Sequence, residues 1–293
     1  LVMVLTCLSS MAFALSIPDD NDGTRRLDDA DIPTQQPTCE EAEAVIKVTY
    51  ADGRTEFYKS LGRNIYWWIT YQNCDRTFTL LEDQHIFEPL QPQEEWRDVP
   101  MTTIDLNGHT ITCDADKFYS SHFDAHLTLK NGTILFNGGL FACTGRTLTS
   151  VLSDRYGFPA SQQIIFEDME IYCPNGQLLL DYQWETLYAF RNSTAWAQTG
   201  ILGTKSDGSG QTKYGFDPWP VSTAQYKSRI TMENSTVGCA EGTLIVFDAP
   251  VTVDVKDSVL VSQDGTLFQA EGGTFTSNMG EETTPWTGTV ADN

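Results

Sequence analysis

The sequence predicts an all-β protein whose chain winds into successive turns of a parallel β-helix. Three observations predict this fold: a short motif that recurs along the chain, an apolar column at one offset from it, and a charged column beside it. Columns of this kind form only if like-numbered residues of successive turns stack, because neighbouring strands lie about 4.8 Å apart and bring equivalent side chains together.

The recurring motif follows alternating apolar residues and contains a short anchor residue. The anchors are Gly108, Asn131, Asp168, Asn192, Asn234 and Asp257, and they are separated by 23, 37, 24, 42 and 23 residues. The short separations suit one turn of the coil. A glycine-containing segment that leads into a Leu begins six or seven residues after most anchors, as in Thr199-Gly200-Ile201-Leu202, and predicts a second corner in each turn. Two corners per turn indicate a coil with about three faces.

Two columns define the expected register. The third residue after each anchor is apolar and should point inward: Ile111, Ile134, Ile171, Ala195, Val237 and Leu260. The residue before each anchor alternates in charge, as Lys130, Glu167, Arg191, Glu233 and Lys256. An exposed ion pair contributes only a few tenths of a kcal/mol, so the alternation indicates register rather than stability.

With these columns in place, the chain resembles the right-handed parallel β-helix proteins of the pectate-lyase-like superfamily. The stretch from Thr103 to Ile111, which includes Asp105-Leu106-Asn107-Gly108, resembles the opening turn of the surface-protein branch, and the likeness covers roughly residues 75 to 280. The resemblance implies a right-handed coil. It does not imply one activity, because the superfamily holds polysaccharide lyases, glycoside hydrolases, adhesins and passive scaffolds.

The chain is expected to be organised around this coil. The expected segments are a truncated signal peptide at 1–14, a disordered leader at 15–38, a cap with the first irregular turns at 39–100, regular turns at 101–278 and a polar tail at 279–293. The apolar residues between Phe57 and Tyr71 predict an amphipathic helix that caps the open N-terminal end. We expect a secreted protein, extracellular or at the cell surface, without a membrane span.

Net charge restricts the ligands that the protein is expected to bind, and the cysteines allow one disulfide to be predicted. The net charge of -22 argues against nucleic acid and allows calcium, and no other cofactor or metal is predicted. Six cysteines follow the presumed signal, and Cys39 with Cys74 is the best candidate disulfide. Cys113, Cys173 and Cys239 should lie inward about 9.6 Å apart, too far to bridge one another.

Two long insertions and an apolar column suggest a binding region. The segments 144–163 and 203–226 lengthen two turns at the same place, so we expect a notch between them. The residues expected to point outward from the second-corner strand are Tyr119, Phe141, Leu179, Ile245 and Phe268. Either the long loops cover this column, or a polysaccharide or protein partner docks there, and self-association is also allowed. Trp196 and Trp219 are further candidates for stacking on sugar rings.

No catalytic motif accompanies the repeat. The candidate carboxylates are Asp154, Asp181 and Asp248, with Arg155 as a candidate base. The expected function is therefore a non-catalytic extracellular scaffold or a surface- or carbohydrate-binding β-helix. The alternative is a polysaccharide lyase or glycoside hydrolase that acts in the groove between the 144–163 and 203–226 loops.

Three anchors also begin N-glycosylation sequons: Asn131, Asn192 and Asn234. Full occupancy would make the protein a glycoprotein with three glycans along one edge of the coil. Asp168 and Asp257 occupy the same column without a sequon, which favours a second interpretation: the turn selects a short Asn or Asp side chain, and the sequons are by-products.

Overall fold

We describe the fold from a computed structural model of the chain. The structure describes residues 34–72, 74–91, 100–121, 126–144, 162–181, 186–204, 228–247, 251–263, 265–270, 275–279, 282–286 and 290–291. Everything below concerns the unit formed by Gln35–Asn293. The described residues are predominantly β-strand, with one α-helix, α2 (Arg63–Tyr71), and one short 3-10 helix, η3 (Glu41–Glu43).

The strands form two large, mostly parallel sheets. The main path of the first sheet runs β2 (Thr55–Tyr58), β1 (Ile46–Tyr50), β3 (Arg76–Leu80), β5 (Thr102–Asp105), β8 (His126–Phe136), β10 (Gln162–Cys173), β12 (Thr186–Arg191), β15 (Ser228–Glu233), β18 (Val251–Lys256), β21 (Phe275–Met279) and β22 (Glu282–Trp286). Joined to it are β4 (Gln84–Ile86), β6 (Thr110–Cys113), β13 (Thr194–Ala197), β16 (Thr236–Cys239) and β19 (Val259–Ser262). The second sheet contains β7 (Lys117–Ser121), β9 (Leu140–Thr144), β11 (Gln177–Asp181), β14 (Leu202–Thr204), β17 (Ile245–Phe247), β20 (Thr266–Ala270) and β23 (Val290–Ala291).

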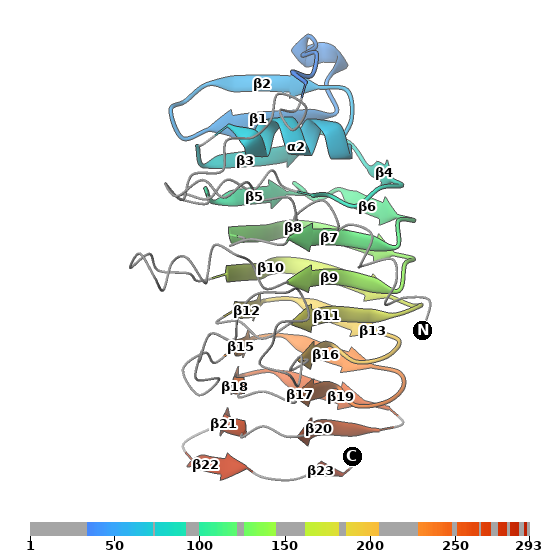
Figure 1. The fold of residues 1–293 in the computed structure, drawn as a ribbon, viewed down its shortest axis with the longest axis vertical. Helices are drawn as coiled ribbons and strands as arrows, with labels where there is room; N and C mark the ends of the chain where they lie inside the picture. The colour runs from blue at the N-terminus through green and yellow to red at the C-terminus, as the bar shows by residue number, and fades with distance from the viewer. Residues whose placement is uncertain are drawn as a thin grey trace, which may run out of the picture. The chain divides into compact units, whose positions relative to one another are not determined.

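The chain visits these strands in a repeating order. One repeat is β12, β13 and β14, and the next is β15, β16 and β17, each strand pairing in parallel with its equivalent. In two repeats the first two strands are continuous, as β8 and β10. Figure 1 shows the equivalent strands lying one beside the next in chain order. This arrangement is compatible with a β-helix-like fold.

The bend between the first and second strand of each repeat lies at the anchors. Asn107, Asn131, Asp168, Asn192, Asn234 and Asp257 all have a positive φ, between 48° and 58°, and they are the only described non-glycine residues that do. Asn and Asp tolerate this left-handed conformation better than other non-glycine residues. The turn therefore selects a short Asx side chain, and Asn107, rather than the neighbouring Gly108, is the first anchor.

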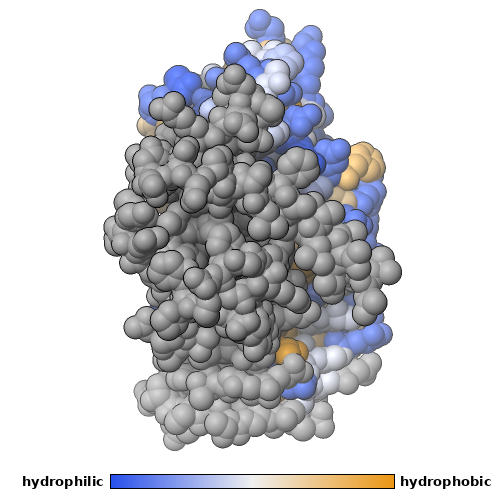
Figure 2. All heavy atoms as spheres, in the orientation of Figure 1, coloured by the Kyte–Doolittle hydropathy of each residue, from blue (hydrophilic) through white to orange (hydrophobic). Residues whose placement is uncertain are grey.

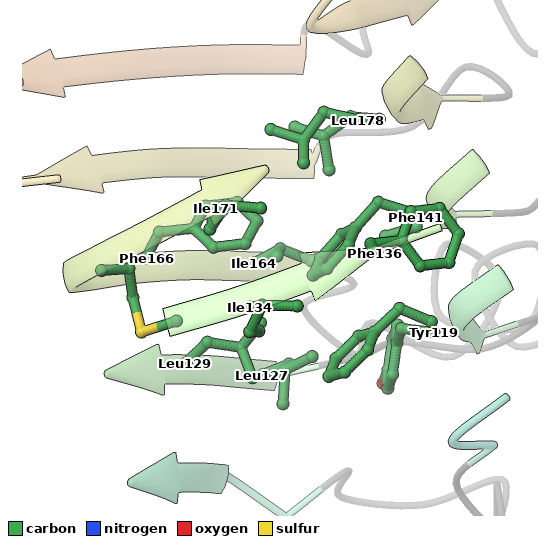
Figure 3. Close-up of a cluster of buried hydrophobic side chains, with 14 of the residues drawn as sticks. Tyr119, Leu127, Leu129, Ile134, Phe136, Phe141, Ile164, Phe166, Ile171 and Leu178 are labelled. Atoms are coloured by element: carbon green, nitrogen blue, oxygen red, sulfur yellow. The ribbon is translucent and has the colours of Figure 1, made fainter. Parts of the chain in front are cut away.

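The predicted apolar column is confirmed. Ile111 pairs with Ile134, Ile134 with Ile171, Ile171 with Ala195, Ala195 with Val237 and Val237 with Leu260. The first five side chains are fully buried, and Leu260 packs against the same core while partly buried. Figure 3 shows Ile134 and Ile171 in the interior together with Phe136, Phe141 and Phe166. Aromatic contacts continue this core, since Phe166 stacks on Phe190 with ring centroids 4.8 Å apart.

The predicted charge ladder is also confirmed. The paired residues are Lys130 with Glu167, Glu167 with Arg191, Arg191 with Glu233 and Glu233 with Lys256. Asp105 pairs with Lys130 and extends the alternation by one step, with an ion pair of 3.3 Å. Lys256 Nζ lies 2.5 Å from Glu233 Oε1 at the other end.

A second ladder, built of serines, accompanies the anchors. The buried backbone N–H of Met169 donates to Ser193 Oγ, the N–H of Ser193 donates to Ser235 Oγ, and the N–H of Ser235 donates to Ser258 Oγ, at 3.0–3.1 Å. Each hydroxyl donates in turn to the carbonyl two residues before it, such as Ser193 to Arg191. The left-handed bend interrupts the regular strand ladder, so the hydroxyls satisfy N–H groups that would otherwise be buried without partners.

The N-terminal end of the first sheet differs from the prediction. Phe57 and Tyr58 belong to strand β2 of an antiparallel β1–β2 hairpin, so the helix begins only at Arg63. A tight turn at Asp52-Gly53 joins the two strands, with a positive φ at Gly53. The helix α2 does pack on this end of the sheet, where Tyr66 stacks on Phe78 of β3 at 5.2 Å between ring centroids (Figure 1).

Strand pairing continues into the predicted polar tail. Strand β22 pairs with β21 and β23 pairs with β20, both antiparallel. Antiparallel strands thus flank the parallel repeats at both ends of the first sheet, where β1 pairs with β2 and β3. Such pairing reduces the number of backbone groups left unpaired at a sheet edge.

Candidate functional site

An outward column of the second strands forms the most distinctive exposed surface among the described residues. We call it the tryptophan stripe: Thr112, Leu135, Tyr172, Trp196, Gly238 and Val261. These residues pair in register, one per strand, from β6 to β19. Since strand side chains alternate between faces, they point away from the buried column of Ile134 and Ile171.

The stripe is apolar at its centre and open to solvent. Leu135 is 40% exposed and Tyr172 is 37% exposed, while Trp196 is half-buried. A single exposed apolar residue is unremarkable in a folded protein, but three in register on neighbouring strands form a contiguous surface. With strands about 4.8 Å apart, the four steps from Leu135 to Val261 span about 19 Å.

Trp196 lies against the neighbouring strand β16. A Cβ added to Gly238 would lie 2.4 Å from Cζ3 and 2.6 Å from Cε3 of the Trp196 ring. No side chain can occupy that position while the ring stays where it is. Glycine in a strand interior commonly marks such a close approach. Gly238 therefore lets the six-membered part of the indole rest on the sheet, beside Tyr172 on the preceding strand.

Polar rows border the stripe on both sides. Two residues before the stripe, the paired positions are Thr110, Thr133, Glu170, Thr194, Thr236 and Val259. Two residues after it lie Asp114, Asn137, Pro174, Gln198, Ala240 and Gln263. The N–H groups of Asn137, Gln198 and Gln263 donate to carbonyls of the preceding turn, so these residues stack in the same order as the strands.

At the N-terminal side of the stripe lies an exposed histidine–aspartate pair. His85 pairs in register with Thr112, and its Nε2 lies 2.6 Å from Asp114 Oδ2. Asn137 Nδ2 donates to Asp114 Oδ1 at 2.6 Å. The hydrogen bonds from Asn137 and His85 lower the pKa of Asp114, so this carboxylate stays ionised at neutral pH. The exposed Phe87 ring contacts His85, with centroids 4.2 Å apart.

In the view of Figure 2, the described surface is mostly hydrophilic, with a few hydrophobic residues on its right-hand side. Within the described ranges, no group of three or more His, Cys, Asp or Glu side chains could hold a metal ion.

The predicted outward column of the second sheet is not a free surface. Phe141 points inward, where it stacks on Phe118 at 4.6 Å and contacts Phe136 and Phe166. In the observed register Tyr119 pairs with Ala142, so the prediction placed Phe141 one residue out of phase. The true outward column is Tyr119, Ala142, Leu179, Leu202, Ile245 and Phe268.

All six residues of this outward column are buried, with exposures of 2% or less. Both faces of the second sheet are therefore packed. Tyr119, Phe141 and Phe268 are therefore packing residues and not the exposed binding residues that the sequence predicts. Figure 3 shows Tyr119 and Phe141 among the buried side chains.

The predicted notch and most catalytic candidates lie outside the described residues. Asp154, Arg155, Trp219 and Asp248 fall there, as do the 144–163 and 203–226 loops except for their ends. Asp181 ends strand β11 and pairs with Thr144 and Thr204, but its side chain is not described. Strands β9 and β14 end at Thr144 and Thr204, where these segments begin, and both pair in parallel with β11, which lies between them.

The predicted Cys39–Cys74 disulfide is not formed, and both cysteines are free and partly exposed. The N–H of Cys39 donates to Phe57 on the outer edge of β2, whereas Cys74 lies beside β3. Strand β1 separates β2 from β3, so two strand spacings of about 4.8 Å lie between the sites. This exceeds the reach of a disulfide.

The remaining described cysteines lie where the sequence placed them. Cys113, Cys173 and Cys239 are buried within the core as free thiols. Burial raises the pKa of all three, and that of Cys113 reaches about 11. Reactive cysteines need a lowered pKa and access to solvent, so these thiols act as small apolar residues.

The three sequon asparagines are anchors at the bend. Asn192 and Asn234 are exposed, and Asn131 is half-buried with its Nδ2 donating to Asp105 Oδ1 at 3.0 Å. In the two Asn-Ser-Thr sequons, the structure gives each position a separate role. Asn adopts the left-handed bend, Ser193 or Ser235 joins the serine ladder, and Thr194 or Thr236 borders the stripe. The bend and the serine ladder thus give a structural reason for the Asn and the Ser of these sequences.

Comparison with protein-family models, with curated proteins and with solved structures finds no match for this chain. The resemblance to the pectate-lyase-like superfamily therefore has no support beyond the repeat itself. What the structure establishes is a predominantly β protein with large, mostly parallel sheets. No helix in the described ranges is long and apolar enough to cross a membrane.

Proposed function

We propose that this protein is a secreted, right-handed parallel β-helix that binds carbohydrate on its surface without cleaving it. The tryptophan stripe is the observation that carries the proposal. It presents Leu135, Tyr172 and Trp196 to solvent on adjacent strands, with the indole resting over Gly238. The apolar C–H face of a sugar ring contacts an aromatic face favourably, while a Tyr hydroxyl and a Trp N–H can form hydrogen bonds at the ring edge.

The stripe also has the support that a rigid binding surface needs. Its residues stand on paired strands rather than on loops, and their neighbours Ile134, Ile171 and Ala195 are fully buried. A site on a sheet keeps its geometry before the ligand arrives, which lowers the ordering cost of binding. Repeated positions about 4.8 Å apart suit a repetitive, extended ligand.

Secretion and glycosylation are the parts of the proposal that depend on the sequence alone. Secretion is supported by the apolar residues 1–14, which resemble the end of a signal peptide. Asn131, Asn192 and Asn234 are then available for glycosylation. Mass spectrometry of peptides before and after deglycosylation tests this part, and unmodified Asn at all three sites would leave turn chemistry as their sole explanation.

A binding screen with a product assay tests the central proposal. The full-length protein is run in native gels that contain individual soluble polysaccharides, with and without calcium, and retardation measures binding. The same mixtures are assayed for new reducing ends and for unsaturated products. We expect retardation by at least one polysaccharide, loss of it in Trp196→Ala, and no new chain ends.

Met101→Ala is the matched control. Met101 is 51% exposed and precedes β5, away from the stripe, so the substitution removes exposed apolar surface elsewhere. Retardation that survives in Trp196→Ala would refute the stripe as the binding surface. Release of chain ends would favour the alternative, a lyase or glycoside hydrolase acting between the 144–163 and 203–226 loops.

A further inference from the structure

The side chains that border the tryptophan stripe are mostly uncharged and polar, unlike the basic side chains expected around an acidic ligand. From β6 to β19, the two bordering rows contain threonines at Thr110, Thr133, Thr194 and Thr236, and amides at Asn137, Gln198 and Gln263. Hydroxyl and amide groups both donate and accept hydrogen bonds, as sugar hydroxyls do. These rows therefore suit uncharged polar groups on either side of an apolar centre.

The charges on these rows are acidic. Among the described residues of the stripe and its two bordering rows, the ionisable acids are Glu170 and Asp114, and there is no Lys or Arg. The basic residues of the charge ladder lie beyond the bend and stand beside acids, as Lys256 does with Glu233. A carboxylated or sulfated polymer would need charge-assisted hydrogen bonds from Lys or Arg side chains, and the described residues of these three rows contain neither.

The net charge of the whole chain also disfavours an acidic ligand. Its net charge is -22, which repels polyanions at low ionic strength. A neutral polymer experiences no such repulsion, and salt does not screen its contacts. The charge distribution thus discriminates between two classes of polysaccharide that the aromatic stripe alone would accept.

We infer that the ligand of the tryptophan stripe is a neutral polysaccharide that lies along the stripe, across the strands, with one sugar ring on the indole of Trp196. The inference rests on the proposed function and specifies its ligand. Neighbouring rings of the same chain then contact Tyr172 on one side and Val261 on the other, and the threonine and amide rows meet the hydroxyl groups.

Gly238 gives this inference a sharp genetic test. In Gly238→Ala the new Cβ would overlap Cζ3 of Trp196 at 2.4 Å, so the indole must lift from the sheet. The obstacle is the far end of a side chain, and alanine suits a strand at least as well as glycine, so the fold should persist. The aromatic ring stays in the protein, and only its position changes. Loss of binding in this variant would therefore show that the ligand needs the indole in its position over Gly238.

The experiment measures affinity for two neutral polymers, hydroxyethylcellulose and xyloglucan, and two acidic polymers, polygalacturonate and alginate. Affinity electrophoresis is run at low and at 0.5 M salt on the wild type, Trp196→Ala, Gly238→Ala and the Met101→Ala control. We expect at least one neutral polymer to bind without salt dependence. Affinity for it should fall about tenfold in Trp196→Ala and about threefold or more in Gly238→Ala. Met101→Ala should stay within about twofold of wild type.

The outcomes separate the inference from the proposal beneath it. Binding of acidic polymers alone, lost in Trp196→Ala, would overturn the neutral-ligand inference and leave the carbohydrate-binding proposal standing. If a folded Gly238→Ala variant binds the neutral polymer as tightly as the wild type does, the claim that a sugar ring rests on the indole of Trp196 over Gly238 is refuted. Circular dichroism and the urea midpoint establish that each variant is folded. Failure of every polymer to bind would remove both the inference and the proposed function.

Discussion

The serine ladder predicts a large effect from the loss of one oxygen atom. Ser193 is 3% exposed, and its hydroxyl accepts from the N–H of the buried Met169 at 3.1 Å while donating to Arg191 at 2.7 Å. Ser193→Ala removes these two bonds and a third, longer one that the hydroxyl donates to the Phe166 carbonyl at 3.3 Å, and it leaves the Met169 N–H buried without a partner. A buried donor left without its acceptor costs about 1–3 kcal/mol, so we expect the free energy of unfolding to fall by about 2 kcal/mol.

The same substitution at the other two serines of the ladder should give stability costs that depend on how buried each site is. Ser235→Ala should cost a similar amount, because it leaves the N–H of the buried Ser193 without its acceptor. Ser258→Ala removes the acceptor of Ser235 at the more exposed end of the ladder, where water can compete, so its cost should be about 1 kcal/mol or less. The three substitutions delete the same atom and differ only in what surrounds it.

Urea unfolding followed by tryptophan fluorescence and far-ultraviolet circular dichroism measures these differences. The slope of unfolding free energy against urea should not change, so a shift of the midpoint reports stability alone. A Ser193→Ala variant within about 0.5 kcal/mol of wild type, or one less affected than Ser258→Ala, would refute the claim that these hydroxyls satisfy buried N–H groups at the bend.

Three further predictions concern the core, the bend and pH. Ile171→Ala should lower unfolding free energy by about 2–5 kcal/mol in the same assay, because it leaves a cavity between Ile134 and Ala195, and a cost below about 1 kcal/mol would contradict the inward column. Asn192→Ala should cost about 1–2 kcal/mol and Asn192→Gly only a few tenths, because φ is 49° there, and equal costs would contradict a left-handed bend. Burial raises the pKa of Cys113 from 9.0 to about 11, so the unfolded thiol ionises first and stability should fall as pH rises from about 9 towards 11. The urea midpoint of the wild type should fall between pH 7 and 10.5, and that of Cys113→Ala should fall less. An equal fall of the midpoint with pH in both proteins would show that Cys113 is not its cause.

Features that repeat at a fixed offset could be predicted from the sequence. The apolar column and the charge ladder each contain one residue per turn at the same distance from an anchor, so several turns support the same register. The inward position of Ile171 and the pairing of Glu167 with Arg191 follow from that spacing. The structure adds the physical cause of the anchors, which is their left-handed backbone.

Features that depend on variable spacing could not be predicted in the same way. The distance from anchor to second corner differs between turns, and a shift of one residue reverses the face of a strand, which is why Phe141 was placed outside. Cysteine content predicts a Cys39–Cys74 disulfide, but it gives no sign that β1 lies between β2 and β3.

Two further features of the fold have signals in the sequence. Ser193, Ser235 and Ser258 each follow an anchor directly, which is the pattern that the serine ladder requires. Asp52-Gly53 stands between two strand-like segments and is a typical hairpin turn. Part of the candidate site could be predicted from the sequence, which makes Trp196 a candidate for stacking on sugar rings. Its contact with Gly238 could not be predicted, because the two residues are 42 positions apart.

Cysteine cross-linking tests the stacking of turns most directly, because the tryptophan stripe exists only if the turns are in register. Thr194 and Thr236 pair on adjacent strands, whereas Thr133 and Thr194 are two strands apart, at about 9.6 Å. Mild oxidation of Thr194→Cys/Thr236→Cys should give a disulfide-linked peptide in mass spectrometry, and Thr133→Cys/Thr194→Cys should not. A cross-link in the second pair and none in the first would contradict the register and the site built on it.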